Sequence, residues 1–131
     1  MEPYRVLIIE DSPDQQVLLT QILGRKYETA CVATAALARE TLARERFDLI
    51  LLDVELPDQS GFALCAEIRQ DENLRSIPVV FLSGHVEPAD KVHGFSVGGD
   101  DYVCKPFEHK EFNARIEFQL RKSREVSERT E

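Results

Sequence analysis

Four short apolar runs punctuate this chain, and each of them ends on a polar residue. The runs cover residues 6–9, 49–52, 79–82 and 102–104. Because they are apolar without alternation, they are expected to be buried on both faces, as in the centre of a parallel sheet covered by helices. The working groups of such sheets lie beyond the carboxyl ends of the strands, at a topological switch point. The chain is therefore expected to carry its functional side chains along one edge of a parallel sheet.

The polar residues at these four strand ends are of the kinds that handle a phosphoryl group. They supply three carboxylates, a hydroxyl and an ammonium, from Glu10, Asp11, Asp53, Ser83 and Lys105. The plain alternative is that they are solvated loop residues, since strands end in loops and loops lie at the surface. One such residue would be unsurprising, but four strand ends with complementary chemistry favour a common site.

Length, charge and cysteine usage narrow the class of protein. At 131 residues the chain is expected to form one domain with a real core. Its net charge of −8, with no basic patch before the last fifteen residues, argues against direct nucleic-acid binding. Three widely spaced cysteines offer neither a disulfide framework nor a CxxC metal site, and are expected to be buried thiols of a cytoplasmic protein. No leader opens the chain and no apolar run could cross a bilayer, so no membrane partner is expected.

Turn signals and helical periodicity alternate with the strand-like runs. Strands are expected at 4–9, 29–32, 47–53, 79–82 and 102–104, and helices at 13–24, 35–46, 62–70, 88–97 and from about 108 onward. The apolar stripes expected along the first and last helices are Val17, Leu18, Ile22 and Leu23, and Phe112, Ile116 and Leu120. Five strands alternating with five helices is the pattern of βαβ units, whose crossovers are right-handed. The predicted fold class is α/β, a single doubly wound parallel sheet of five strands with five helices.

The order and spacing of these motifs resemble the receiver domain of two-component response regulators. The residues that carry the resemblance are Glu10-Asp11, the run Leu52-Asp53-Val54-Glu55-Leu56-Pro57-Asp58-Gln59-Ser60-Gly61, Ser83, and the run Gly99-Asp100-Asp101-Tyr102-Val103-Cys104-Lys105-Pro106-Phe107. The match covers about residues 4 to 122 and is specific, although each motif alone is weak. It departs from the family pattern at Glu10, commonly aspartate, and at Ser83, commonly threonine.

The resemblance implies a flavodoxin-like fold of strand order 2-1-3-4-5 and a role in phosphorelay signalling. Asp53 is the implied acceptor of a phosphoryl group from a histidine kinase or a histidine phosphotransfer protein. The chain would not be an enzyme, because it would catalyse only its own phosphorylation and slow dephosphorylation. The implied output is a change of shape on the face formed by the fourth helix, fifth strand and fifth helix.

The resemblance also assigns roles to individual residues. Catalytic roles fall to Asp53, Ser83 and Lys105, metal binding to Glu10, Asp11, Asp53 and the backbone carbonyl of Glu55, and switching to Ser83 and Tyr102. The Lys105-Pro106 peptide bond is implied to be cis.

A magnesium requirement also follows from the chemistry of the residues. A carboxylate at Asp53 is a poor nucleophile towards an anionic phosphoryl group, and Glu10 and Asp11 add to the repulsion. Two charges about 4 Å apart interact by roughly 4 kcal/mol at an effective dielectric near 20. Mg²⁺ prefers hard oxygen ligands and is usually held by one or two carboxylates with substrate phosphate. Lys105 would add a fixed positive charge and Ser83 a hydroxyl donor.

Two other functions remain open from the sequence. A Mg²⁺-dependent phosphohydrolase of the haloacid dehalogenase type also forms an aspartyl phosphate after a parallel strand, but it usually needs Asp-x-Asp, and Glu55 stands at the second place. The second alternative is a receiver-like interaction module that is never phosphorylated. A nucleotide-binding Rossmann domain is excluded, because the glycines that it needs after the first strand are missing.

The end of the chain and the mouth of the site carry two further expectations. Residues 1–122 are predicted to form the receiver domain, and 123–131 a charged helical extension or the start of a linker to an output domain. The resemblance also allows for a homodimer. Glu55 lies two residues after the acceptor and His85 two after Ser83, so both side chains are expected to border the mouth through which water reaches Asp53.

Overall fold

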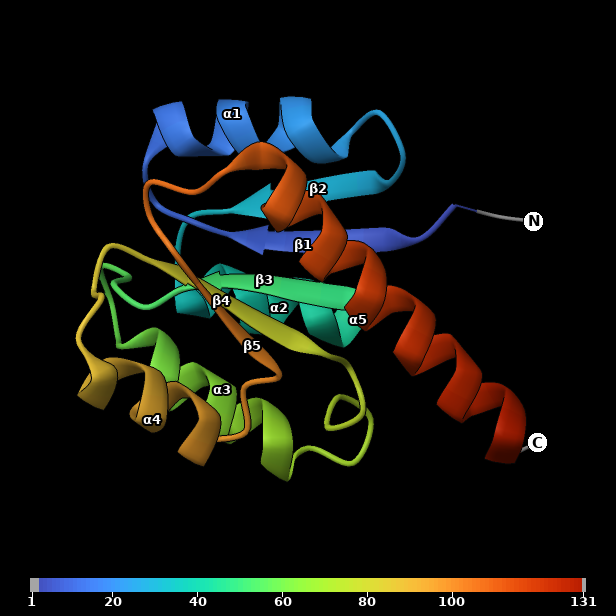
Figure 1. Ribbon diagram of the computed structural model, residues 1–131. Helices are drawn as coiled ribbons and strands as arrows, with labels where there is room; N and C mark the ends of the chain where they lie inside the picture. Colours follow the sequence, from blue (N-terminus) through green and yellow to red (C-terminus); the bar gives the residue numbers. More distant parts are fainter. Residues whose placement is uncertain (1–2, 131) are drawn as a thin grey trace.

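Strands and helices alternate along the whole chain, as the sequence predicts. The structure, a computed structural model, describes residues 3–130, with side chains through Arg124. The elements are β1 (Arg5–Ile9), α1 (Pro13–Leu23), β2 (Glu28–Val32), α2 (Ala35–Arg44), β3 (Leu49–Asp53), α3 (Gly61–Gln70), β4 (Val79–Ser83), α4 (Pro88–Ser96), β5 (Asp101–Cys104) and α5 (His109–Thr130). The strands form one parallel sheet in the order β2-β1-β3-β4-β5 (Figure 1). The predicted fold class and strand order are confirmed.

Helices cover both faces of the sheet, so the molecule has two apolar cores. In Figure 1, α1 and α5 lie on one face and α2, α3 and α4 on the other. Successive strand residues point to opposite faces, so Val6 and Ile8 pack towards α1 and α5, whereas Leu7 and Ile9 pack towards α2 and α3. This burial on both sides explains why the strands are apolar without alternation.

Several helix starts are set by side chains that accept backbone hydrogen bonds. Ser12, Thr34 and Ser60 are the N-caps of α1, α2 and α3, and each accepts from an amide of the first turn. The start of α2 has a second support from a distant loop: the two carboxylate oxygens of Asp58 accept from the amides of Ala35 and Ala36, each at 2.9 Å. Asp58 therefore ties the β3–α3 loop to α2.

Most differences from the predicted elements are shifts of one or two residues at their ends. The strand predicted from residue 47 begins at Leu49, and the helix predicted to residue 46 ends at Arg44, because Glu45 is already extended with φ −131°. The predicted apolar stripe of the first helix was wrong in part: Val17 is 58% exposed, and Leu19 is buried in its place. The stripe predicted for the last helix, Phe112, Ile116 and Leu120, is confirmed.

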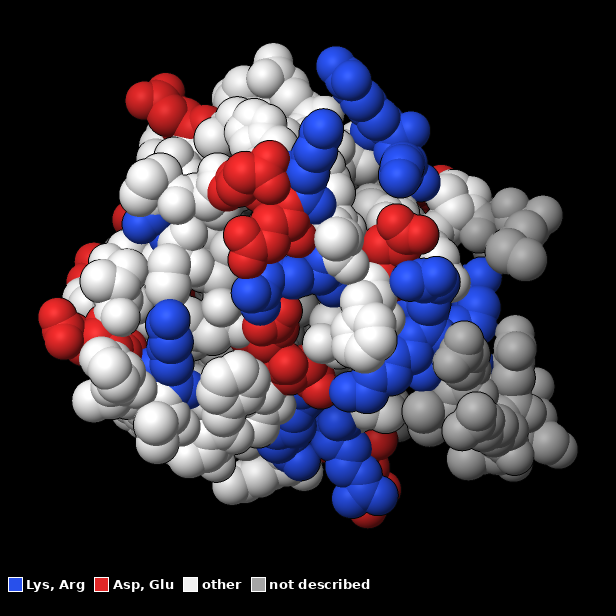
Figure 2. Space-filling model, in the orientation of Figure 1, with Lys and Arg blue, Asp and Glu red and all other residues white. Residues whose placement is uncertain are grey.

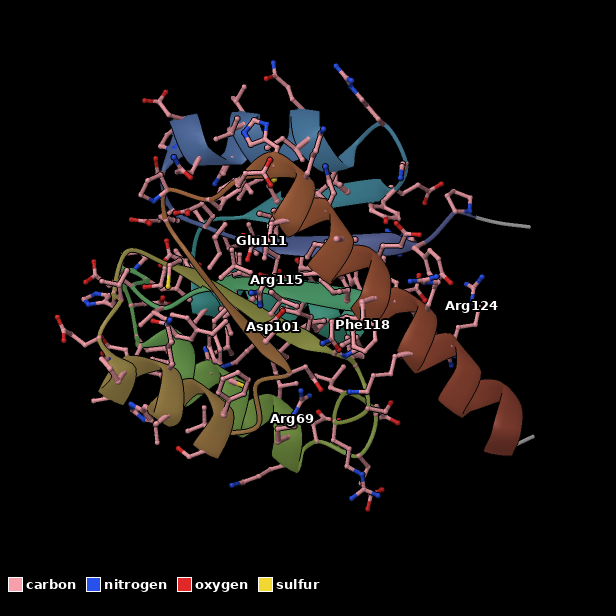
Figure 3. All side chains as sticks on the ribbon, viewed as in Figure 1. Arg69, Asp101, Glu111, Arg115, Phe118 and Arg124 are labelled. Atoms are coloured by element: carbon pink, nitrogen blue, oxygen red, sulfur yellow. The ribbon has the colours of Figure 1, made fainter. Side chains whose placement is uncertain are left out.

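The last helix continues beyond the sheet. Figure 1 shows α5 extending past the strands, and it runs through Thr130. On the face that carries α5, acidic and basic side chains lie side by side (Figure 2), and Arg115 pairs there with Asp101 and Glu111 (Figure 3). None of the helices within the described part of the chain has the length and apolarity to span a bilayer.

Candidate phosphoacceptor site

Three carboxylates meet where β1 and β3 end. Ile9 and Leu52 are partners in the parallel register of these neighbouring strands, so the next residues, Glu10 and Asp53, lie side by side. Asp11 follows Glu10, and each of the three carboxylates offers an oxygen within 4.8 Å of the others. The crowding predicted from the sequence is therefore present.

The ammonium of Lys105 bridges two of these carboxylates. Its Nζ donates to Oε1 of Glu10 at 2.7 Å and to Oδ2 of Asp53 at 3.0 Å. Lys105 follows β5 at the same edge of the sheet, and its backbone amide donates to the carbonyl of Ser83. The Lys105-Pro106 bond is cis, as predicted.

Burial sets the electrostatics of this cluster. Glu10 is only 2% exposed, and burial raises the pKa of its carboxyl, although Lys105 opposes this shift. Burial lowers the pKa of Lys105, but its hydrogen bonds to Glu10 and Asp53 outweigh that effect, and the pKa is raised overall. The lysine is therefore held in its charged form between the two carboxylates.

The predicted switch residues both contact the backbone of one residue, His85. Ser83 is fully buried at the end of β4, and its Oγ accepts from the amide of His85 at 3.0 Å. The hydroxyl of Tyr102 donates to the carbonyl of His85 at 2.8 Å. Tyr102 is 5% exposed, with its ring 5.9 Å from that of Phe81, so its side chain is buried. Burial raises the pKa of the Tyr102 hydroxyl.

Glu55 connects to the acceptor through its backbone and to the neighbouring loop through its side chain. Its amide donates to Oδ1 of Asp53 at 2.9 Å, and its exposed carboxylate contacts Nε2 of His85. Both residues line a shallow cavity of about 490 Å³ beside the site, together with Ser60, Phe62 and Asp90. Glu55 and His85 therefore lie together beside the site, through a contact that had no sequence signal, and their control of water access to Asp53 stays a prediction.

The cysteines lie apart from this cluster. Cys65 is buried as expected, and burial raises its pKa to about 11. Cys31 and Cys104 are only half-buried, so the expectation of three buried thiols was wrong for these two.

The acidic cluster fits Mg²⁺. Glu10, Asp11 and Asp53 present hard oxygen donors close enough together to share one small cation. The set contains no sulfur or imidazole ligand that would favour a softer metal. Three carboxylates against one ammonium leave the described cluster with a net negative charge, which a divalent cation offsets.

A flavodoxin-like sheet with an acidic cluster, a lysine and a hydroxyl at its carboxyl edge defines a class of signalling domain. The chain matches the response regulator receiver domain over residues 6–117, and it belongs to this family. It is 37% identical to the transcriptional regulatory protein GltR of Pseudomonas aeruginosa over 119 residues, 90% of this chain and 49% of GltR.

Solved structures give the same assignment. The receiver domain of a signal transduction histidine kinase from Syntrophus aciditrophicus is 35% identical, with a TM-score of 0.83 and 89% of each chain covered. The receiver domain of a sensor histidine kinase of Pseudomonas aeruginosa PAO1, solved with a magnesium ion coordinated in its active-site cleft, is 29% identical, with a TM-score of 0.83 over 90% of this chain and 98% of that one.

The curated relatives are longer than this chain. The chain spans 49%, 51% and 50% of the length of three of them, and 27% of a fourth. The family is that of the receiver domains of two-component response regulators, which implies phosphorelay signalling.

Proposed function

We propose that this chain is a Mg²⁺-dependent phosphoacceptor switch that receives a phosphoryl group on Asp53 from a phosphohistidine donor. The donor is a histidine kinase or a histidine phosphotransfer protein. The observation that carries the proposal is the contact of Lys105 with Asp53, beside the carboxylates of Glu10 and Asp11. It combines a nucleophile, a fixed positive charge and a set of metal ligands at one edge of the sheet.

The residues of the chain divide the chemistry between them. Glu10, Asp11 and Asp53, with the backbone carbonyl of Glu55, would hold Mg²⁺, which when bound screens the negative charges and polarises the phosphoryl oxygens. A carboxylate oxygen of Asp53 forms the bond to phosphorus as the phosphorus–nitrogen bond of the donor breaks.

Lys105 and Ser83 stabilise the transferring group. The ammonium of Lys105 already lies 3.0 Å from Asp53, and it offsets charge on the phosphoryl oxygens during transfer. The hydroxyl of Ser83 donates to one of those oxygens in the product. Phosphoryl transfer depends mostly on such positioning and charge stabilisation, so the chain needs no further catalytic group and is not an enzyme for another substrate.

The signal would leave the site through Ser83 and Tyr102. Ser83 contacts the backbone amide of His85 and Tyr102 its carbonyl, so a shift of Ser83 towards the phosphoryl group reaches the β4–α4 loop and α4. The face formed by α4, β5 and α5 carries exposed apolar side chains, among them Val92, Phe95 and Phe118 at 68%, 51% and 54%. Such side chains suit a surface that binds another protein surface.

The location and the output complete the proposal. The three free cysteines are typical of the reducing cytoplasm, where we place the protein. Residues 123–130 continue α5, and a linker to an output domain would follow, in line with the greater length of the relatives. The sequence of the longer protein would identify that output domain.

The test is phosphorylation by a small donor. Acetyl phosphate or phosphoramidate with Mg²⁺ should add one phosphoryl group, read by intact mass, and hydroxylamine should remove it, as it does an acyl phosphate. Asp53→Asn should abolish the adduct, whereas Asp14→Asn, which removes a carboxylate from the first turn of α1, should keep it. An adduct that persists in Asp53→Asn places the acceptor elsewhere.

The same assay separates the two alternatives. A phosphohydrolase would release phosphate continuously from a phosphomonoester, and its adduct would not accumulate. An interaction module that is never phosphorylated would show no Mg²⁺-dependent gain in mass with either donor.

A further inference from the structure

The β3–α3 loop, residues 54–60, leaves the acceptor strand and folds back onto it. Glu55 and Ser60 form an isolated antiparallel bridge at the base of the loop. A Cβ at Gly61 would clash with the carbonyl oxygen of Asp53, so the end of the loop lies directly against the acceptor backbone. At its beginning, the amide of Glu55 donates to Oδ1 of Asp53 at 2.9 Å. A displacement of the loop therefore changes the contacts of the acceptor carboxylate.

The tip of this loop has little apolar packing to hold it. Pro57 and Asp58 are exposed, and Leu56 and Gln59 are only half-buried. A segment with few buried contacts opens at low free-energy cost. The position of the tip therefore depends on the polar contacts that it makes with the neighbouring helices.

Asp58 connects the tip to the start of α2. Its two carboxylate oxygens accept from the amides of Ala35 and Ala36, each at 2.9 Å. A carboxylate is favoured there, because the first amides of a helix have no partner within the helix and the helix dipole is positive at this end. Buried side chains, among them Ala38 and Leu42, fix α2 to the core, so the helix can serve as an anchor for the loop.

The next two amides of α2 have a separate partner. Thr34, the N-cap residue, accepts through Oγ1 from the amide of Leu37 and through its carbonyl from the amide of Ala38, each at 3.0 Å. The start of α2 is therefore capped both by its own N-cap residue and by Asp58. Only Asp58 belongs to the acceptor loop, so substitution can separate support of the helix from support of the loop.

We propose that Asp58 is a positioning residue for the acceptor site. By holding the tip of the β3–α3 loop on α2, its carboxylate fixes the backbone of Glu55, whose amide contacts Asp53 and whose carbonyl would bind Mg²⁺. The role rests on the proposed function, because it acts through the metal and the acceptor. A loop that is already in place binds the metal more tightly, since binding does not have to order it.

The effect should be moderate, because a second set of contacts also holds the tip. Gln59 contacts the guanidinium of Arg39, and its side-chain amide donates to the carboxylate of Glu67 at 2.6 Å. Loss of the Asp58 carboxylate should therefore reduce the population of the competent loop, and the apparent Mg²⁺ affinity falls in proportion. We expect Asp58→Ala to weaken Mg²⁺ binding by about three- to tenfold, at the low end of the effect of residues that orient metal ligands.

Titration of the protein with Mg²⁺, followed by NMR, tests the role without any phosphodonor. Asp58→Ala should bind Mg²⁺ more weakly than the parent. Thr34→Ala removes a cap of the same helix but no contact of the loop, so its Mg²⁺ affinity should stay within about twofold of the parent, although its unfolding midpoint falls. Parent-like affinity in Asp58→Ala overturns the positioning role. Equal weakening in Thr34→Ala also overturns it, because damage to α2 would then be the cause.

Asp58→Asn separates the contact from the charge. Asparagine keeps an oxygen that accepts from the helix amides but carries no charge, so its Mg²⁺ affinity should lie between those of the parent and Asp58→Ala. An affinity as weak as that of Asp58→Ala would assign the effect to charge and overturn the positioning role.

Amide hydrogen exchange in the metal-free protein gives a second readout, which Asp58→Asn can supply alone if Asp58→Ala does not fold. The amides of Glu55 and Gly61 are hydrogen-bonded to Asp53 and Val54, and both should exchange faster when the tip is released. Parent-like exchange at both amides refutes the positioning role alone, provided that the parent binds Mg²⁺ in an Asp53-dependent manner. Absence of Asp53-dependent binding by the parent refutes the proposed function, and the positioning role with it.

Discussion

Lys105 and Glu10 lie 95 positions apart in the chain, and Nζ of the lysine is 2.7 Å from Oε1 of the glutamate. The same ammonium is 3.0 Å from Asp53. Glu10 has almost no access to water, with its side chain 3% exposed, whereas the lysine side chain is 22% exposed. Lys105 is therefore the group that makes a buried carboxylate tolerable, in addition to its proposed role in phosphoryl transfer.

Lys105→Met should destabilise the metal-free protein. Removing the ammonium leaves Glu10 and Asp53 without their shared countercharge, and loss of one partner of a buried pair costs about 3 kcal/mol. Urea unfolding without Mg²⁺ measures the loss of unfolding free energy. Saturating Mg²⁺ should reduce the difference in unfolding free energy between the variant and the parent. Lys110→Met, at an exposed position in the first turn of α5, is the matched control and should change stability little. Equal unfolding midpoints for the two variants would contradict the bridging role.

Asp53→Asn should stabilise the metal-free protein. The change relieves repulsion among three carboxylates, and Lys105 keeps its partner Glu10, so no buried charge is left alone. Saturating Mg²⁺ should stabilise the parent by mass action, about 2.7 kcal/mol at 100 times the dissociation constant, and the variant less. Thermal melts with and without Mg²⁺ measure both effects. A destabilised Asp53→Asn variant with unchanged Mg²⁺ affinity would refute the electrostatic clustering.

Asp58 should make stability depend on pH in the acid range. Its hydrogen bonds from the amides of Ala35 and Ala36 lower the pKa of its carboxyl below the ordinary value of 3.8. The folded state therefore favours the ionised form, and this contribution is present above pH 3.8 and lost as the pH falls through the lowered pKa. The difference in unfolding midpoint between the parent and Asp58→Ala should be largest near neutral pH and shrink below pH 4, as urea titrations can measure. If the difference in unfolding midpoint between the parent and Asp58→Ala stayed constant from pH 7 to pH 3, Asp58 would not be the source of the pH dependence.

The sequence predicted the topology and the main site residues because both depend on local signals. Uniformly apolar strands specify burial on both faces, and polar residues at their ends then meet at one edge. Because Ile9 pairs with Leu52 in neighbouring parallel strands, the residues that follow them, Glu10 and Asp53, lie side by side. The ends of helices and strands were less predictable. Glu45, for example, ends α2 because its backbone is extended, and its side chain type does not indicate this conformation.

Contacts between loops had no local signal. Asp58 caps a helix whose first amides lie 23 and 22 positions earlier, and nothing around Asp58 specifies that partner. The contact between Glu55 and His85 likewise depends on how far two loops lean towards each other. The exposure of Val17 was missed for a different reason. Helical spacing identifies an apolar stripe, but the way in which α1 packs on the sheet buries Leu19 and leaves Val17 exposed.

Gly98 should resist substitution. Its φ of +104° is a conformation that side chains rarely adopt, and a Cβ there would lie 2.7 Å from Cγ of Arg69. The guanidinium of Arg69, labelled in Figure 3, donates to the carbonyls of Gly98 and Ile77 and to the carboxylate of Asp100, so it cannot easily move aside. Gly98→Ala should cost at least about 1–2 kcal/mol of unfolding free energy. Gly84→Ala, at an open position, should cost much less, and equal losses would show that the Arg69 contacts do not constrain Gly98.

The lifetime of the phosphoryl group should depend on the mouth of the site. Glu55 and His85 line one cavity, and we expect a water molecule to approach the phosphorus atom in line through it. A carboxylate at position 55 can orient that water or repel the anionic phosphoryl group. Replacing either residue with alanine should therefore change the hydrolysis rate by about tenfold, or roughly 1.4 kcal/mol in the barrier. The decay of purified phosphoprotein in Mg²⁺ measures the hydrolysis rate. Glu72→Ala, on the α3–β4 connection and outside the cavity lining, is the control. Decay within a factor of about two of the parent in both mouth variants would show that neither side chain governs access of water.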